Sequence, residues 1–220
     1  MRLNKYVALA SGLSRRAADD AIAKGQISVN QQIASLGQHI DPVDDTVMLD
    51  GKVLEAPASP TTIMLNKPVG YVCSRDGQGS KTIYDLLPAD MHRLKPVGRL
   101  DKYSSGLLLM TNDGQLAYQL THPKFEKIKK YNVAINKDLT EEDHKKITAT
   151  GVQLEDGISK FMLGKVNNQY KDWKVSMSEG KNRQIRRTFE ALGYSVVKLH
   201  RTQFGDYSLA MLKPGSYIDA

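Results

Sequence analysis

The chain has 220 residues, of which 40% are hydrophobic and 25% are charged. This composition excludes a chain that is disordered throughout, and the length suits one medium domain or a small domain with a larger one. The formal net charge of +7 favours a polyanionic partner, and the single cysteine, Cys73, excludes an intrachain disulfide. We therefore expect a protein of the reducing cytoplasm.

The apolar run at residues 6–10 is too short for an export signal or a membrane span, and Arg15 and Arg16 follow it closely. The five histidines are scattered, and none stands at metal-ligand spacing from another histidine or from Cys73. We expect no membrane association and no metal site.

The first fifty residues predict two helices and a small sheet. Residues 3–10 form the first predicted helix, and Ser14 is the predicted N-cap of a second helix that Gly25 ends. Short strands are predicted at residues 27–30 and, in several pieces, over residues 33–49.

Charge is unevenly distributed in this region, which holds five cations and six acidic residues up to Asp50. The cations all precede Gly25, so one face is predicted to present a positive strip to phosphates. The alternative is a solvated helix face on which Arg15 and Asp19, four residues apart, pair with each other.

A domain boundary is indicated by the small residues and prolines of residues 55–61. We predict an N-terminal domain over residues 1–52, a linker over residues 53–61 and a second domain over residues 62–220.

The second domain mixes predicted strands and helices without regular βαβ spacing. The predicted strands are residues 63–65, 70–74, 106–111, 131–135 and 173–178, and the predicted helices are residues 82–87, 115–120, 141–149 and 183–192. This pattern predicts an α+β fold built on a mixed, mostly antiparallel sheet.

Asp101 stands in a stretch that reads G-R-L-D-K-Y-S-S-G over residues 98–106, directly before four apolar residues at 107–110. An apolar run without alternation predicts a central strand that is buried on both faces. Asp101 then lies at the edge of the core, between two cations. The alternative is a solvated aspartate in a turn.

Residues 96–114 resemble the active-site motif of the bacterial rRNA pseudouridine synthases of the RsuA/RluB type. That motif reads roughly G-R-L-D, two variable residues, T-S-G, a leucine run and T-N-D-G, and Ser104 keeps the hydroxyl of the usual threonine. Residues 180–193 resemble the family's C-terminal arginine motif, residues 129–131 its K-x-Y segment and residues 65–70 the opening of its catalytic domain. The resemblance covers essentially the whole chain.

The N-terminal domain resembles the S4 RNA-binding domain. The order of helix, helix and small sheet is similar, and residues 14–18, S-R-R-A-A, resemble the basic helix start of that domain. The resemblance implies an RNA-binding role for residues 1–52.

The resemblance implies an isomerase that converts uridine in RNA to pseudouridine, without redox change and without a cofactor. Asp101 matches the catalytic aspartate. Its carboxylate is suited to attack the sugar C1′, to add to the uracil C6 or to remove a C2′ proton, and the sequence leaves these three routes open. Tyr131 matches the tyrosine whose ring stacks on the extruded uracil.

Two neighbouring arginines receive different predicted roles from helical geometry. In the predicted helix near the C-terminus, Ile185 and Phe189 share the apolar face, Arg186 lies at the edge of that face and Arg187 lies nearly opposite. An aspartate in a water-poor pocket needs a cation to stay ionised. Arg186 is therefore predicted to reach Asp101, as the resemblance also implies, and Arg187 to face solvent or phosphate.

The cations expected to contact RNA fall in both domains. They are Arg2, Lys5, Arg15 and Arg16 in the first domain and Arg99, Lys129, Lys181, Arg183 and Arg187 in the second.

These observations predict an isomerase that acts on ribosomal RNA, as free RNA or in an assembling subunit, and that works as a monomer. Residues 34–37 and 151–157 resemble the large-subunit 23S branch of the family more than the small-subunit 16S branch, which is the alternative. A non-catalytic RNA-binding assembly factor is a second alternative. A hydrolase of a nucleoside bond would require a second acid positioned for attack by water, and no paired motif presents one.

Overall fold

The computed structural model describes residues 1–55, 60–166 and 171–220 and divides into two compact units, Met1–Pro60 and Thr61–Ala220. Residues 56–59 of the predicted linker lie outside the described residues. Among the described residues, no helix is long and apolar enough to cross a membrane.

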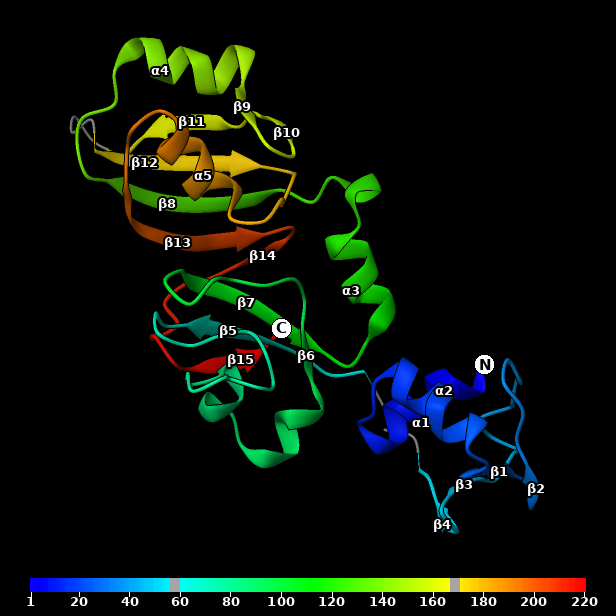
Figure 1. The fold of residues 1–220 in the computed structure, drawn as a ribbon. Helices are drawn as coiled ribbons and strands as arrows, with labels where there is room; N and C mark the ends of the chain where they lie inside the picture. The colour runs from blue at the N-terminus through cyan, green and yellow to red at the C-terminus, as the bar shows by residue number, and fades with distance from the viewer. Residues whose placement is uncertain (56–59, 167–170) are drawn as a thin grey trace. The chain divides into compact units, whose positions relative to one another are not determined.

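The N-terminal unit packs two helices on a small antiparallel sheet (Figure 1). Its elements are α1 (Leu3–Ser11), α2 (Arg15–Ala23), β1 (Ile27–Val29), β2 (Gln32–Ile33), β3 (Val47–Leu49) and β4 (Lys52–Val53), with strand order β2-β1-β3-β4. The hydroxyl of Ser14 accepts a hydrogen bond from the Ala17 amide at 3.0 Å, which is the expected N-cap of α2.

The C-terminal unit is built on a nine-stranded sheet whose main path runs β11-β12-β8-β13-β7-β5-β15 (Figure 1). Its strands are β5 (Thr62–Lys67), β6 (Lys95–Pro96), β7 (Ser105–Thr111), β8 (Lys129–Ile135), β11 (Met162–Lys165), β12 (Asp172–Met177), β13 (Val196–Phe204), β14 (Tyr207–Ser208) and β15 (Tyr217–Asp219). Only β13 and β7 pair in parallel among the described strands. The predicted α+β fold with a mixed, mostly antiparallel sheet is confirmed.

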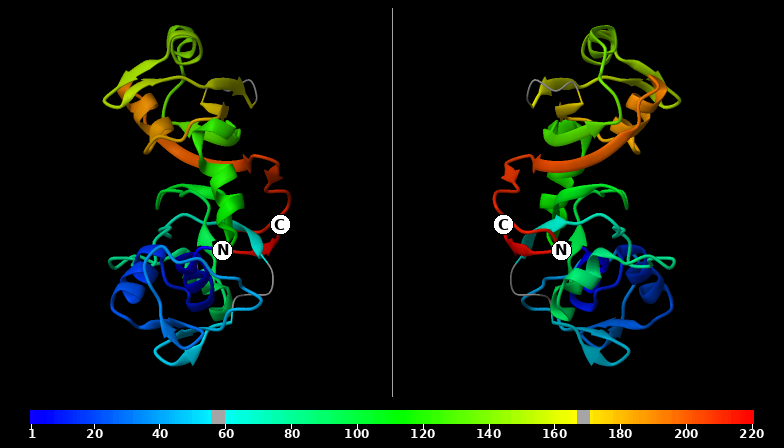
Figure 2. Two further views of the ribbon diagram at one scale, coloured as in Figure 1. Left: turned by 90° about the vertical axis from the view of Figure 1, so that its right-hand side faces the viewer. Right: turned by 90° about the vertical axis from the view of Figure 1, so that its left-hand side faces the viewer.

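Shorter elements cover this sheet and connect its strands. They are η1 (Ile83–Leu86), η2 (Ala89–Arg93), α3 (Gly114–Thr121), η3 (Pro123–Phe125), α4 (Glu141–Lys145), the π-helical turn η4 (Lys146–Thr150), the hairpin β9 (Val152–Leu154) and β10 (Gly157–Ser159), and α5 (Gln184–Ala191). Figure 2 shows α4 beyond the β11 end of the twisted sheet.

Three local predictions were wrong or incomplete. The helix predicted at residues 82–87 is the 3-10 helix η1, because the Thr82 capping box closes a single short turn. The strand predicted at residues 70–74 is reduced to one bridge between Val72 and Thr82. The sequence analysis did not predict β13, which is the longest strand of the sheet. Its residues mix polar and apolar types without a clear alternation, so the sequence gives no strand signal there.

The buried central strand before the motif's Asn-Asp-Gly turn is confirmed. Leu108 and Met110 of β7 enter the main hydrophobic core, while Leu107 and Leu109 enter a second core on the other face. Both faces of β7 are therefore covered, which explains its continuous apolar sequence.

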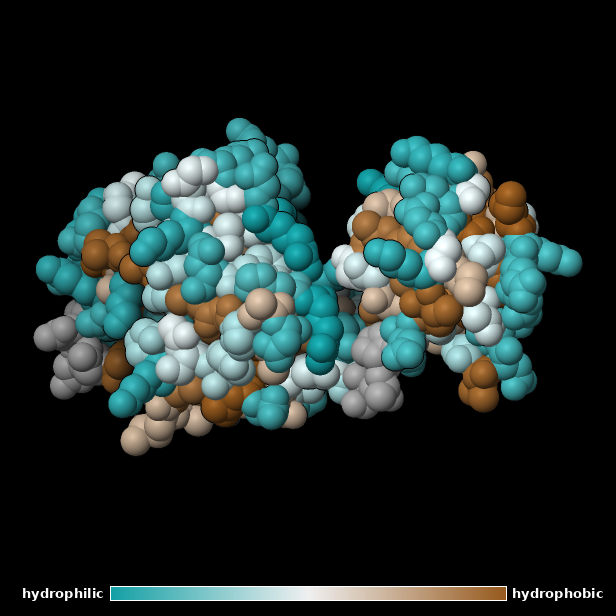
Figure 3. Space-filling view, turned by 90° about the horizontal axis from the view of Figure 1, so that it is seen from below, coloured by the Kyte–Doolittle hydropathy of each residue, from teal (hydrophilic) through white to brown (hydrophobic). Residues whose placement is uncertain are grey.

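The face of the molecule seen in Figure 3 is largely hydrophilic, with hydrophobic residues in small separate groups.

Candidate active site

A pocket of about 650 Å³ opens in the C-terminal unit where six segments meet. It is lined by the loop before β7, by the end of α3 with η3, by β8, by the segment after β12, by the start of α5 and by β13. Asp101, Tyr131, Arg183 and Arg201 all line it. A pocket of this size accommodates a nucleotide-sized ligand.

Lys67, a fully buried lysine at the end of β5, anchors the loop that carries Asp101. Its ammonium group donates hydrogen bonds to the carbonyl oxygens of Ser104 at 2.7 Å, Asp101 at 3.0 Å and Pro68 at 3.1 Å. Burial lowers the pKa of Lys67 to about 8, and the Asp101 carboxylate opposes this shift. The sequence analysis did not single out Lys67, because a lysine 34 residues from Asp101 gives no local signal of this contact.

Asp101 itself lies at the pocket surface, with 32% of its side chain exposed. Its carboxylate forms an ion pair with Arg183, at 3.7 Å between Oδ2 and Nη1. We predicted that Arg186 is the ion-pair partner of Asp101. That prediction was wrong, because Arg183 takes this place. Arg183 adopts a left-handed backbone conformation, with φ of 45°, directly before α5, and helical geometry does not apply to such a residue.

Arg186 faces inward as predicted, but its hydrogen bonds go to the loop and to a neighbouring segment. It donates to the carbonyl oxygens of Tyr103 at 2.8 Å and Val196 at 2.9 Å, and to the Ser104 hydroxyl at 3.3 Å. Burial lowers the pKa of Arg186, Arg183 adds to this effect and Asp101 opposes it. Arg186 therefore anchors the residues that follow Asp101.

Tyr131 forms part of the pocket wall and is buried in the main core. It lies on β8 in register with Val175 on one side and with Arg201 on the other. The structure brings Tyr131 and Asp101 to the same pocket, and the stacking role of the tyrosine stays a prediction.

Four of the predicted RNA-binding cations line the pocket: Arg99, Lys129, Lys181 and Arg183. Lys129 donates to the Ser178 carbonyl at 2.7 Å, and burial lowers its pKa, with Arg201 adding to the effect. The excess of positive charge around the pocket suits a phosphodiester ligand.

Arg187 is not among the residues that line the pocket. Its guanidinium donates two hydrogen bonds to Asp156, at 2.7 and 3.0 Å, and this pairing lowers the pKa of the Asp156 carboxyl. Arg187 therefore lies at the surface and away from the pocket, as predicted, and pairs there with Asp156, while its contact with phosphate stays a prediction.

Arg201 is a pocket residue that sequence reasoning missed. It lies on β13, is 3% exposed, and donates from Nε to the Leu107 carbonyl at 2.7 Å. Its backbone passes so close to Gly106 of β7 that a side chain on Gly106 would collide with it. The glycine of the S-S-G motif is the sequence signal for this close approach.

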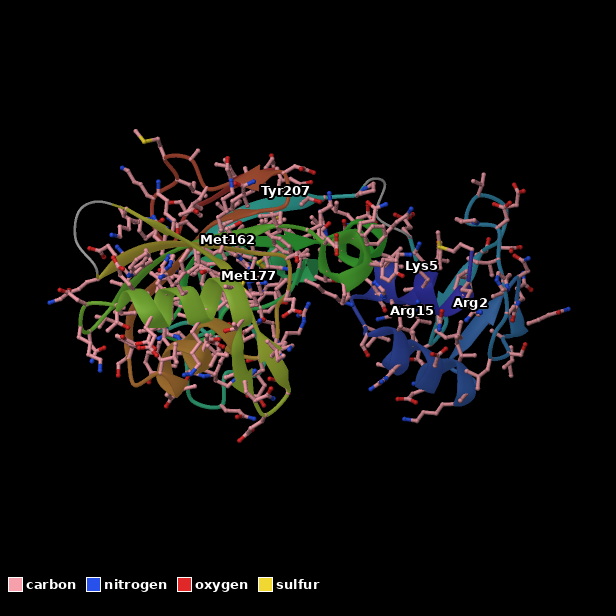
Figure 4. The ribbon with its side chains drawn as sticks, turned by 90° about the horizontal axis from the view of Figure 1, so that it is seen from above. Arg2, Lys5, Arg15, Met162, Met177 and Tyr207 are labelled. Carbon is pink, nitrogen blue, oxygen red and sulfur yellow. The ribbon has the colours of Figure 1, made fainter. Side chains whose placement is uncertain are left out.

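The predicted cations of the N-terminal unit are exposed. Figure 4 shows Arg2, Lys5 and Arg15 on this unit, and Arg16 follows on α2. Arg15 donates to the side-chain carbonyl of Asn4 at 3.1 Å. Asp19 accepts from the amide of the same asparagine, so the direct pair of Arg15 with Asp19 is not formed.

Comparison with known families gives two matches. Residues 61–191 match the family described as RNA pseudouridylate synthase, and residues 1–47 match the S4 domain.

Individual relatives extend these matches over most of the chain. Proteins named ribosomal large subunit pseudouridine synthase B from Vibrio cholerae, Pseudomonas aeruginosa and Bacillus subtilis are 37%, 39% and 35% identical to it. The alignments cover 94%, 93% and 97% of this chain and 67%, 55% and 89% of those relatives. The chain thus spans only about half the length of the Pseudomonas protein.

A solved structure described as a crystal structure of pseudouridylate synthase is similar over 100% of this chain and 96% of its own. The TM-score is 0.71 and the sequence identity is 32%. The similarity therefore includes both units of the chain.

Proposed function

The chain belongs to the family of RNA pseudouridylate synthases, and from this premise we propose that it isomerises a specific uridine of 23S ribosomal RNA to pseudouridine. The names of the relatives from three bacteria support the large-subunit target. The S4 domain of the N-terminal unit supports binding of RNA outside the pocket. We include a monomeric state and a cytoplasmic location in the proposal.

The reaction exchanges one bond to the sugar for another. The bond between C1′ and uracil N1 breaks, the uracil turns, a bond between C1′ and C5 forms, and the proton on C5 is lost while N1 gains one. Atoms and electrons balance within the nucleotide, so the reaction consumes no oxidant, reductant or group donor. The protein must supply a carboxylate, keep it ionised and hold an unstacked base beside it.

Asp101 is the carboxylate in this proposal, and it forms an ion pair with Arg183 inside the pocket. Lys67 and Arg186 fix the loop around it through backbone carbonyl oxygens, so the carboxylate needs little reorganisation before it reacts. Tyr131 offers a flat wall for the uracil in the same pocket.

The single observation that carries the proposal is this anchoring of Asp101. A buried lysine that donates to the carbonyl oxygens of Asp101 and Ser104 has a cost in desolvation, and a solvated turn does not require it. The same observation disfavours a non-catalytic assembly factor, in which nothing would require a fixed carboxylate in a cation-rich pocket. A uridine of 16S ribosomal RNA is the alternative target.

The test compares Asp101→Asn with the wild-type protein on purified 23S and 16S ribosomal RNA, with pseudouridines mapped at single-nucleotide resolution. We expect one modified uridine in 23S RNA with the wild type and none with the variant, because the amide neither attacks carbon nor accepts a proton. Asp90→Asn is the matched control, since Asp90 is an exposed aspartate of η2 that does not line the pocket.

Two results would change the proposal. Modification of 16S RNA alone would move the target to the small subunit. Substantial turnover by Asp101→Asn would remove Asp101 from the chemical step.

A further inference from the structure

Three aromatic side chains form an exposed cluster on α3 and η3. Tyr118, His122 and Phe125 follow one another at helical spacing, and Tyr118 and Phe125 are 45% and 37% exposed. The Tyr118 ring centroid lies 4.8 Å from that of His122 and 5.6 Å from that of Phe125. The rings therefore pack mainly on each other and leave ring surface in solvent.

Lys124 completes this cluster, which we call the aromatic platform. Its ammonium nitrogen lies 5.1 Å from the centroid of the Tyr118 ring and 4.8 Å from that of Phe125. These distances are those of cation–π contacts. The backbone amide of Lys124 also donates to Nδ1 of His122 at 3.3 Å, which orients the imidazole. The platform thus combines aromatic surface, in which the Tyr118 and Phe125 rings stand at 89° to each other, with a positive charge.

The aromatic platform is continuous with the pocket that contains Asp101. His122, Pro123 and Lys127 line that pocket. Tyr118 and Phe125 touch His122 from the outer side, since neither of them lines the pocket. A ligand that leaves the pocket past His122 therefore meets these two rings.

The size and the charge of the platform suit a nucleotide better than a protein. A stable protein interface buries about 800 Å² on each partner, far more than three partly exposed rings offer. Lys124 adds positive charge, which attracts phosphates, whereas Lys127 is paired with Asp206 at 3.3 Å. Aromatic rings beside cations are the usual binding surface for unpaired bases.

We propose that Tyr118 stacks on an unpaired base next to the target uridine, that Phe125, whose ring stands at 89° to that of Tyr118, packs against the edge of this base, and that Lys124 contacts its phosphate. This inference rests on the proposed function, because it takes the occupant of the pocket to be a uridine that has left its stack. Removing that uridine leaves a neighbouring base without its stacking partner. The aromatic platform replaces the lost contact outside the pocket.

The test measures binding of a seven-nucleotide single-stranded RNA with one central uridine, flanked on each side by the fluorescent base 2-aminopurine. A matched RNA carries abasic nucleotides at the two flanking positions. The proteins are the wild type, Tyr118→Leu, Phe125→Leu and the double variant. Leucine keeps apolar volume but offers no aromatic face. Tyr118→Phe is the control, because it keeps the ring.

With the wild type and Tyr118→Phe, we expect quenching of 2-aminopurine on binding and affinity about tenfold higher for the RNA with bases than for the abasic RNA. The double leucine variant should bind both RNAs about equally and should not quench. Lys124→Met should reduce the salt dependence of binding by a slope of about 0.7, as expected for one lost phosphate contact on a single strand. Circular dichroism should show the same fold for all variants, since the substituted rings are exposed.

Equal discrimination between the two RNAs by the wild type and the double variant would overturn the inference, and so would the absence of quenching with the wild type. The 23S modification assay is independent of this binding test. If the wild type modifies 23S RNA but does not discriminate between the two probes, base stacking on the aromatic platform is refuted and the proposed function stands. A wild type that discriminates between the probes but modifies neither ribosomal RNA would refute the proposed function and retain the platform.

Discussion

In the N-terminal unit, the buried side chains among the described residues are apolar except for the hydroxyl of Tyr6, which donates to the Leu54 carbonyl, and the cations lie at the surface. The C-terminal unit instead buries Lys67, Arg201, Asn66, Gln184 and several hydroxyl groups. Burial of polar groups costs free energy unless each is hydrogen-bonded. The first unit therefore carries little of this cost. In the second unit, buried polar side chains lower the free energy of unfolding but fix the loop and the strands around the pocket.

The Lys67→Met substitution should have the largest effect on stability and on rate, because Lys67 is the buried cation that anchors the Asp101 loop. The substitution leaves the buried carbonyl oxygen of Ser104 and the partly buried ones of Asp101 and Pro68 without their donor. The cost is about 1–3 kcal/mol for a buried unsatisfied group, offset in part by removal of a buried charge. The Asp101 loop then loses its anchor, and we expect the single-turnover rate to fall at least ~100-fold. Lys5→Met in the N-terminal unit is the control, with an expected change in unfolding free energy within about 0.5 kcal/mol. Similar effects of both variants would contradict the contrast.

The pH dependence of stability should also depend on Lys67. Its pKa of about 8 in the folded protein lies below the ordinary value of 10.5, so between these values the unfolded chain binds more protons. The contribution of Lys67 to the unfolding free energy should therefore rise with pH from about 8 to about 10.5, by up to ~3 kcal/mol. The measurement is the difference between wild type and Lys67→Met in denaturant titrations across that range. Parallel curves for the two proteins would show that Lys67 is not the group concerned.

Arg186 and Arg187 sharpen the contrast within one helix. Arg186→Met frees the loop at Tyr103 and Ser104, and we expect the single-turnover rate at saturating protein to fall about 100-fold. Arg187→Met removes an exposed ion pair with Asp156 and should leave the thermal transition unchanged, because exposed pairs are screened by solvent. Its effect on the rate should be within about threefold of wild type. Equal losses of rate in the two variants would show that the Asp101 loop does not depend on Arg186.

Removal of residues 1–60 should have the smallest effect on the chemical step. The pocket lies wholly within the C-terminal unit, so the truncated protein should keep its thermal transition and its rate at saturating RNA. Affinity for long 23S fragments should fall about tenfold, and the salt slope should fall by up to ~3 for the loss of Arg2, Lys5, Arg15 and Arg16. Unchanged affinity would deprive the N-terminal unit of its RNA-binding role.

The sequence by itself determined features that depend on neighbouring residues. The unbroken apolar run of β7, the N-cap Ser14 and the inward face of Arg186 follow from local patterns, and all three are present in the structure. Resemblance to the family's motifs pointed to Asp101 and Tyr131, which the structure brings to one pocket.

Only the tertiary structure decided which groups touch. Arg183 pairs with Asp101 because a left-handed backbone residue redirects its side chain, and Lys67 reaches the same loop from a strand 34 residues earlier. Asp156 reaches Arg187 from 31 residues away. These contacts depend on backbone conformation and on the pairing of distant strands, and the periodicity of a sequence carries no information about either.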